Sequence, residues 1–333
     1  MYRKQSFLTF LLCAFIVLGM TGLSAADNTT NTNEETMSQA QELLKKADEL
    51  FNSREYTKSR SVFEEALKAA EEAGSSSDKT EALAMIARTY LILDDKETGY
   101  QWLKKAHSAA EIDEPAGWAR FIGVRGRFLW QDDKKEEATV LFENMYDYCN
   151  EHELYNQAVD AAHMIAITGD VRTQIEWAYK GIKAAEAGNY TRWLGPLWNN
   201  LGATYEDLNQ NYEALESYVQ ARKYHYMHGT ELNKAIADWA VGHMYIKIGE
   251  FSGAWERLLP LLPKFEELKN DEFVGLTCKE LGEVRYAEKN YKDAIEYYER
   301  AELLLREAKM PEWDADGFQY LLDKKALSQE KLK

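Results

Sequence analysis

A small residue that returns about every 40 positions is the feature that most constrains the fold of this chain. Successive copies are 40, 39, 36, 40, 40 and 40 residues apart, and we call them the anchors: Ala47, Ala87, Gly126, Ala162, Gly202, Gly242 and Gly282. Three positions after six of the seven anchors stands a large apolar or aromatic residue, and Arg285 is the exception. Residues three apart share one face of a helix. Self-similarity at this period therefore predicts a stack of helical repeats.

Each anchor helix is followed by a polar break and then by a second helix with its own pattern. Breaks such as Asp94-Asp95 and Gly249-Glu250 predict turns between the two helices. In the second helices a small residue is followed by a large one and then by a further small or apolar one, as in Ala138/Phe142/Met145, Ala214/Tyr218/Ala221, Ala254/Leu258/Leu261 and Ala294/Tyr298/Ala301. Small residues let the two helices of a hairpin approach closely, and the large residues are expected to fill the space between neighbouring hairpins. Neither helix can bury its apolar face alone, so the hairpins are expected to stack.

The stretch from Trp198 to Tyr205 reads Trp-Asn-Asn-Leu-Gly-Ala-Thr-Tyr and is followed by Ala214, Tyr218 and Ala221. This string resembles the tetratricopeptide repeat family, and a HEAT-type solenoid of similar period does not account for it. The resemblance covers residues 40–308, with repeats that start near residues 40, 80, 119, 155, 195, 235 and 275. It implies an all-α fold, a right-handed superhelical solenoid of about seven helical hairpins over residues 38–310.

Two features depart from the family pattern. The period of 40 residues exceeds the usual length of about 34, which implies longer helices or linkers. Pro260 falls inside the expected second helix of the sixth repeat. Proline bends or breaks a helix, so the second helix is expected to be irregular there.

The N-terminus carries an export signal. Arg3 and Lys4 precede an apolar run over residues 7–20, and Ser24-Ala25-Ala26 supplies small residues for cleavage. The pattern predicts a signal peptide over residues 1–26 and a periplasmic or secreted protein. The alternative is an uncleaved membrane anchor, because residues 7–23 form a stretch of 17 residues, and a bilayer requires about 17 to 25.

The segments on either side of the repeats are expected to differ. Residues 27–37 are polar and lack apolar periodicity, which predicts a disordered linker. Residues 311–333 place apolar side chains on one side and charges on the other, which predicts a C-terminal capping helix. Its apolar side chains are Phe318, Leu321, Leu322 and Leu327.

The charge and cysteine content limit the classes of partner and of fold. The formal net charge is -16, and it becomes -18 without residues 1–26, which contain two basic residues and no acidic one. Because no dense basic stripe offsets this charge, nucleic acid is not expected as a partner. Only Cys149 and Cys278 remain outside the signal segment, too few for a disulfide framework.

No sequence motif points to an enzyme. Nucleotide loops, nucleophile elbows and zinc-protease motifs do not occur, so we expect neither catalysis nor a cofactor. His225 and His228 are three apart and could share a metal ion, but no third ligand is evident in the sequence, so a metal-dependent enzyme stays a distant alternative. The aromatic-rich, exported chain also leaves glycan binding open as an alternative, although aromatic residues that follow the repeat period indicate core packing.

The resemblance implies a concave groove lined by the first helices, in which family members commonly bind a peptide. Residues at minus six, minus three, plus one, plus four and plus five from each anchor share the face that the anchor leaves free. The predicted peptide-binding groove comprises Arg88, Arg120, Arg127, Trp130, His163, Asn199, Trp239, His243, Lys247 and Lys279. Acidic residues on the same face are Asp48, Glu81, Glu206, Asp207 and Glu283.

This face predicts a protein or peptide partner with an acidic segment or a free C-terminus. Arg120 and Arg127 are expected to supply charge, and Trp130 and Trp239 apolar anchorage. The alternative is that the arginines are solvated helix surface. The face does not reproduce the Lys/Asn arrangement with which some family members hold a chaperone's C-terminal carboxylate, so chaperone binding is not inferred.

Overall fold

The computed structural model describes residues 37–333, so the expected signal peptide (residues 1–26) and nearly all of the expected linker (residues 27–37) lie outside the described part. Residues 37–333 form helices joined by short turns and contain no strand, which confirms the all-α expectation. None of these helices has the length and apolar character needed to cross a bilayer.

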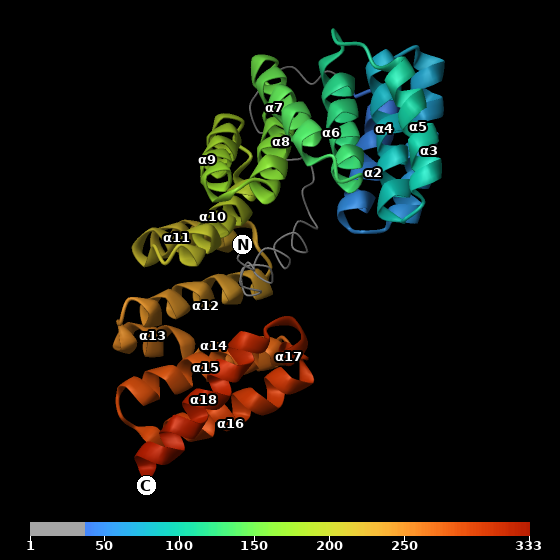
Figure 1. Ribbon diagram of the computed structural model, residues 1–333. Coiled ribbons are helices and arrows are strands. Elements are labelled where there is room, and N and C mark those ends of the chain that lie inside the picture. The colour runs from blue at the N-terminus through green and yellow to red at the C-terminus, as the bar shows by residue number, and fades with distance from the viewer. Residues whose placement is uncertain (1–36) are drawn as a thin grey trace. The chain divides into compact units, whose positions relative to one another are not determined.

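The chain divides into two compact units, and the described part of the N-terminal unit is residues 37–194. Its first helices α2, α4, α6 and α8 pack side by side, and each forms a hairpin with the helix that follows it (Figure 1). The helices are α2 (Gln39–Asn52), α3 (Tyr56–Ala73), α4 (Ser76–Ile92), α5 (Lys96–Ala109), α6 (Pro115–Gln131), α7 (Lys135–Glu151), α8 (Tyr155–Thr168) and α9 (Val171–Ala187).

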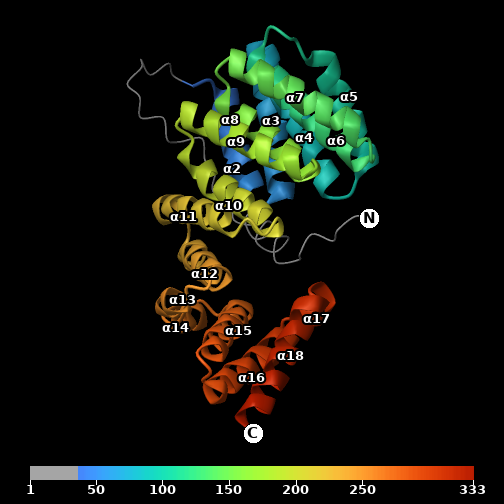
Figure 2. The same ribbon diagram turned by 60° about the vertical axis from the view of Figure 1, so that its left-hand side comes forward.

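The C-terminal unit comprises residues 195–333, and α10 (Thr191–Asp207) crosses from one unit into the other. Within it α12 packs against α11, α13 and α15, while α15 pairs with α16 and α18 covers α16 (Figure 2). Its further helices are α11 (Asn211–His228), α12 (Glu231–Lys247), α13 (Phe251–Leu258), α14 (Leu261–Glu267), α15 (Asp271–Ala287), α16 (Tyr291–Glu307), α17 (Met310–Trp313) and α18 (Ala315–Leu332).

The turn after a first helix has the same backbone form in most of the hairpins. Asp94, Asp133, Asn209 and Lys289 all have φ between 57° and 63°, in the left-handed region, and Gly249 has φ 84°. A left-handed residue ends a helix because it turns the next N–H back onto the carbonyls of the last turn. The hairpin break is therefore fixed by backbone geometry and not by one residue type.

The large side chains of the second helices pack against the glycine anchors of the first helices. A Cβ atom added at Gly126 would lie 2.6 Å from Phe142, and one at Gly282 would lie 2.5 Å from Tyr298. The same contact joins Gly202 to Tyr218 and Gly242 to Leu258, at 2.9 and 2.7 Å. Such distances are too short for a real Cβ, so the helix-to-helix fit requires glycine at these positions.

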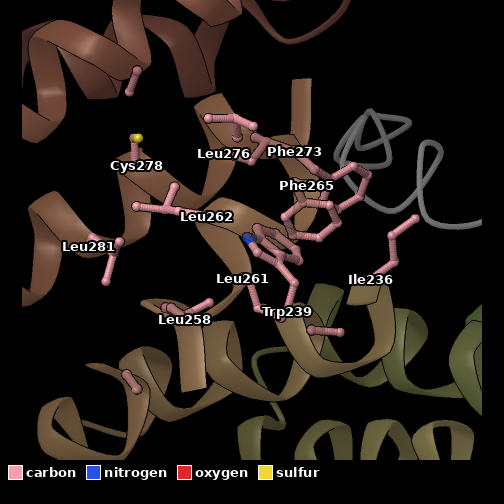
Figure 3. Packing of buried hydrophobic residues seen from close by; sticks show 14 of the residues in the cluster. Ile236, Trp239, Leu258, Leu261, Leu262, Phe265, Phe273, Leu276, Cys278 and Leu281 are labelled. Atoms are coloured by element: carbon pink, nitrogen blue, oxygen red, sulfur yellow. The ribbon is translucent and has the colours of Figure 1, made fainter. Parts of the chain in front are cut away.

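Pro260 interrupts the second helix of the sixth hairpin, as the sequence indicated. The helix ends as α13 at Leu258 and resumes as α14 at Leu261. The interruption turns the buried side chains of α14 into the core of the C-terminal unit, where Phe265 stacks on Phe273 of α15 with ring centroids 5.1 Å apart. Figure 3 shows these rings beside Trp239.

The expected terminal helix is present as α18. Phe318 and Leu321 are buried, as their spacing indicated, and Ser328 is buried with them. Leu327 is exposed instead, because the buried side of the helix continues through its neighbour Ser328, whose hydroxyl donates to the carbonyl of Lys324. The apolar face of α18 is therefore slightly rotated from the expected one.

Candidate functional site

The position directly after the anchor is ionisable in six of the seven first helices. A residue next to the anchor is turned by about 100° from it, so it lies beside the face that packs against the second helix. Ala203 on α10 is the exception. The plus-one residues are Asp48, Arg88, Arg127, His163, His243 and Glu283.

Arg120 joins three first helices of the N-terminal unit. Its Nη2 lies 2.6 Å from Oδ2 of Asp48 on α2, and its Nε lies 3.2 Å from Oε2 of Glu81 on α4. Burial opposes the charge of Arg120, but the two carboxylates outweigh it and raise the pKa of the guanidinium. Burial raises the pKa of Glu81, although Arg120 opposes that shift. Arg120 is thus committed to partners within the chain.

Arg127 is held in the same way by the next first helix. Its Nη2 lies 2.7 Å from Oδ1 of Asp160 on α8, and its Nη1 donates to the carbonyl of Gly123 at 3.0 Å. Burial works against ionisation of Asp160, but Arg127 and then Arg88 outweigh it and lower the pKa of that carboxyl. For the neighbouring His163, burial lowers the pKa of the imidazole, so this ring is neutral at pH 7.

Arg88 differs from both of these arginines. Its guanidinium stacks over the ring of Phe51 at 4.7 Å, and its Nε is buried without a hydrogen-bond partner. Within residues 37–333 no carboxylate lies at ion-pair distance from it. Burial, followed by the charge of Arg127, lowers the pKa of Arg88 to about 9, so it remains a cation at pH 7. We call Asp48, Glu81, Arg88, Arg120, Arg127, Asp160 and His163 the charged row.

Exposed apolar side chains stand about one turn beyond the charged row. Ile92 on α4 is 40% exposed, Trp130 on α6 is 38% exposed and Ile167 on α8 is 42% exposed. They follow Arg88, Arg127 and His163 by three or four residues, so each shares a helix face with a member of the row. We call Ile92, Trp130 and Ile167 the apolar row.

The C-terminal unit instead surrounds its plus-one cation with acids. Nε2 of His243 on α12 lies 2.9 Å from Oε1 of Glu206 on α10, and Nδ1 lies 3.1 Å from Oε1 of Glu280 on α15. Lys279 reaches the same oxygen of Glu280 at 3.0 Å, and the Tyr218 hydroxyl donates to Glu206 at 3.2 Å. We call these five residues the His243 network.

Each charge in the His243 network faces an opposite one, although Nδ1 of His243 lies at ion-pair distance from Glu280 without the geometry of a hydrogen bond. Burial opposes the charged imidazole, but Glu280 and Glu206 outweigh it and raise the pKa of His243 to about 9. The pKa of Glu280 lies well below its usual range, because Lys279 and His243 outweigh the effect of burial. A histidine that bridges two carboxylates on different helices holds α10, α12 and α15 together.

Glu283 has a similar set of partners further along α15. It accepts hydrogen bonds from the hydroxyls of Tyr298 at 2.8 Å and Tyr320 at 3.1 Å, and Lys324 lies 3.0 Å from it. These contacts join α15 to α16 and to the terminal α18. The plus-one residue of the last repeat therefore fastens the capping helix to the stack.

Several residues of the predicted groove lie in the core. Trp239 is 1% exposed and meets Phe273 edge to face at 5.5 Å, while Asn199 and His243 are also buried. The expectation that Trp239 offers an exposed apolar anchor is wrong, because the minus-three side chain faces the next first helix (Figure 3). Trp130 and Lys247 are exposed, and Lys279 is half-buried in its ion pair.

The predicted groove left out four residues that the geometry brings forward. Asp160 and Glu280 stand two residues before their anchors, one turn from the plus-one position, and they are the carboxylates that hold Arg127 and His243. Ile92 and Ile167 stand at the plus-five position that had been assigned to the face. An acidic residue two positions before one anchor, together with a basic residue directly after the preceding anchor, would have predicted these ion pairs from the sequence.

His225, a candidate metal ligand in the sequence, packs against α10 instead. Its ring would lie 3.1 Å from a Cβ atom at Gly195, and burial lowers its pKa to about 4. Among the residues that the structure describes, no three His, Cys, Asp or Glu side chains are gathered as metal ligands would be. Cys149 and Cys278 are free and buried.

Comparisons with known proteins agree with this architecture. Residues 195–222 match the family model of the tetratricopeptide repeat. The apo form of RapI is similar with a TM-score of 0.66 and 14% identity, over 86% of this chain and 85% of that one. A signal-transduction ATPase with a tetratricopeptide repeat sensor from Pyrococcus horikoshii has a TM-score of 0.61 and 16% identity, over 83% of this chain and 45% of that one.

A third similar structure is the C-terminal part of a tetratricopeptide repeat-containing protein from Cytophaga hutchinsonii. Its TM-score is 0.50 and its identity 13%, over 78% of this chain and 95% of that one. No curated protein matches the sequence. The matched repeat and the similar folds confirm the fold and the resemblance read from the residues between Trp198 and Ala221.

Proposed function

We propose that this chain, which is a tetratricopeptide-repeat protein, is an exported, non-catalytic scaffold that binds a protein or peptide partner. The proposed contact surface is the charged row together with the apolar row on α4, α6 and α8. The observation that carries the proposal is the recurrence of an exposed apolar side chain at the end of three consecutive first helices. A helix normally buries such residues, and grouped exposed apolar side chains mark sites of interaction.

The two rows have the composition of a protein-binding site. Arginine and tryptophan are enriched among the residues that contribute most to binding, and here the surface includes the half-buried Arg88 on α4 and the exposed Trp130 on α6. The overall charge of -16 disfavours nucleic acid and leaves protein as the class of partner that these side chains fit. Because consecutive hairpins repeat the rows, an extended or helical segment could contact several repeats at once.

Peptide display against the purified protein tests this proposal. Selected peptides should lose about 30-fold or more in affinity with Trp130→Ala, which is the effect of removing an aromatic hot spot. Ile167→Ala should cost less, because it removes a smaller contact. Val140→Ala and Tyr179→Ala are matched controls, since both residues are exposed on the second helices α7 and α9. If Trp130→Ala and Ile167→Ala bind like wild type while circular dichroism shows an intact fold, the partner uses another surface.

Export is the second part of the proposal, and it is supported by the residues before Asp27. The exported protein should begin at Asp27, because small residues stand one and three positions before it. The intact mass of the secreted or periplasmic protein measures this directly. A membrane-bound product that retains residues 1–26 would make the protein an anchored scaffold.

A further inference from the structure

The charged row contains one cation that no carboxylate of the described residues contacts directly, although Asp160 and Asp48 act on it at longer range. Arg120 is paired with Asp48 and Glu81, and Arg127 is paired with Asp160, whereas Arg88 has only the ring of Phe51. Its Nε is fully buried without an acceptor. A buried N–H group without an acceptor is unfavourable, and most proteins avoid it.

The surroundings of Arg88 indicate which kind of ligand group could pair with its guanidinium. The residue as a whole is half-buried, so part of it reaches solvent. Ile92, one turn further along α4, is exposed, and the rings of Phe51 and Trp130 lie on the adjoining first helices α2 and α6. A ligand group that fits here has a negative charge and apolar neighbours.

We propose that Arg88 is the carboxylate-binding residue of this surface, and that the partner presents a Glu or Asp side chain next to apolar residues. The inference rests on the proposed function and names the chemistry of the partner. A guanidinium can bind a carboxylate through two parallel N–H groups, and an acid is the complement that the chain does not supply. Arg120 and Arg127, the residues that the sequence indicated for this role, already bind carboxylates of the chain itself.

The free protein offers a first test that needs no partner. Arg88→Met keeps an unbranched apolar side chain over Phe51 and removes the buried N–H group that has no acceptor, so the melting temperature should rise by about 2 to 4 °C. Arg127→Met is the matched control, because it leaves Asp160 buried without its partner and should lower the melting temperature by about 5 °C or more. A fall with Arg88→Met as large as that with Arg127→Met would show that Arg88 is structural and would overturn the inference.

The second test uses the peptides selected in the display experiment. Peptides with Glu or Asp replaced by Gln or Asn should bind wild type about 30-fold more weakly, and Arg88→Met should bind both forms equally weakly. If the acidic and amide peptides bind wild type equally well, the carboxylate assignment is wrong, although the proposed function stands. If no peptide is selected at all, the proposed function fails.

A small-molecule probe tests independently of any peptide whether Arg88 binds a carboxylate. Succinate, compared with chloride at equal ionic strength, should raise the melting temperature of wild type and not that of Arg88→Met. Stabilisation by inorganic phosphate without stabilisation by succinate would overturn the carboxylate assignment in favour of a phosphorylated group. No stabilisation by either anion would show that Arg88 binds no anion and would also overturn it.

Discussion

Arg88 and His243 occupy the same register in two different units and have opposite surroundings. Each is a cation directly after its anchor, on α4 and α12. His243 is bridged to Glu206, four residues after the anchor of the preceding first helix, and to Glu280, two before the anchor of the next. At the equivalent positions around Arg88 stand Phe51 and Val124.

The comparison shows that the register fixes where a charge lies, while the neighbouring helices decide what it does. Two acids convert the plus-one cation into a bridge that holds three helices of the C-terminal unit. Two apolar residues leave the cation of the N-terminal unit without an anion at ion-pair distance, and Asp160 and Asp48 act on it only at longer range. Arg127 supports this rule, because the carboxylate that pairs with it, that of Asp160, also stands two residues before the anchor of the following helix.

The largest effect is expected when the C-terminal surroundings are made to resemble the N-terminal ones. Glu280→Val places an apolar residue where α6 has Val124, and it leaves His243 and Lys279 without their shared carboxylate. Loss of one partner from a buried ion pair should lower the free energy of unfolding by about 3 to 5 kcal/mol. Urea denaturation measures the loss. Glu288→Gln, in an exposed ion pair with Arg285, is the control and should change stability by less than about 1 kcal/mol.

The pH dependence of stability should separate the two units. The pKa of His243 is raised to about 9, so its contribution is fully present below the unfolded value of about 6.5 and is lost as pH rises to 9. The expected loss in unfolding free energy of the C-terminal unit over this window is about 3 kcal/mol. His243→Gln should remove this dependence, and an equal slope in wild type and variant would contradict the charged bridge.

The anchors should matter equally in both units, because they serve packing and not charge. Gly126→Ala and Gly282→Ala each push a methyl group into a ring of the second helix, Phe142 or Tyr298. Each should reduce the unfolding free energy by about 1 to 3 kcal/mol. Gly74→Ala is a poor control because its φ is 70°, whereas Lys68→Ala on the exposed face of α3 should be neutral. A marked inequality between the two anchor variants would show that the hairpins are packed differently.

The smallest change in stability is expected from a partner built into the N-terminal unit. Phe51→Glu places a carboxylate at the position that Glu206 has relative to His243. The gain from pairing Arg88 and the loss of apolar contact should nearly cancel, within about 1 kcal/mol. Affinity for acidic peptides should nevertheless fall, because the site is occupied by the chain itself. Phe51→Gln has a similar shape without the charge and should bind acidic peptides more tightly than Phe51→Glu does.

Much of the fold was readable because it depends on one repeated fit. The anchors and Pro260 were marked in the sequence. Phe142 and Tyr298, however, pack against the glycine anchor of their own hairpin, whereas the pattern had placed the large residues between neighbouring hairpins. The helix register also placed Arg88, Arg127 and His243 on related faces.

The burial and the ion pairs of the site residues could not be predicted from the sequence in the same way. Burial of Trp239 and pairing of Arg127 depend on side chains contributed by the next helix, about 35 residues further along the chain. An offset within one helix does not contain that information. Arg88 was grouped with Arg120 and Arg127 for this reason, although its neighbours leave it in a different state.

Urea unfolding of Arg88→Met and His243→Met, measured side by side at pH 7, tests the central comparison most directly. Both substitutions remove the cation directly after an anchor and put the same side chain in its place. His243→Met should lower the free energy of unfolding by about 3 to 5 kcal/mol, because Glu206 and Glu280 lose the group between them. Arg88→Met should raise it by about 1 kcal/mol, because a buried N–H group without an acceptor is removed. Two losses of similar size would contradict the account, since Arg88 would then be as firmly bound within the fold as His243.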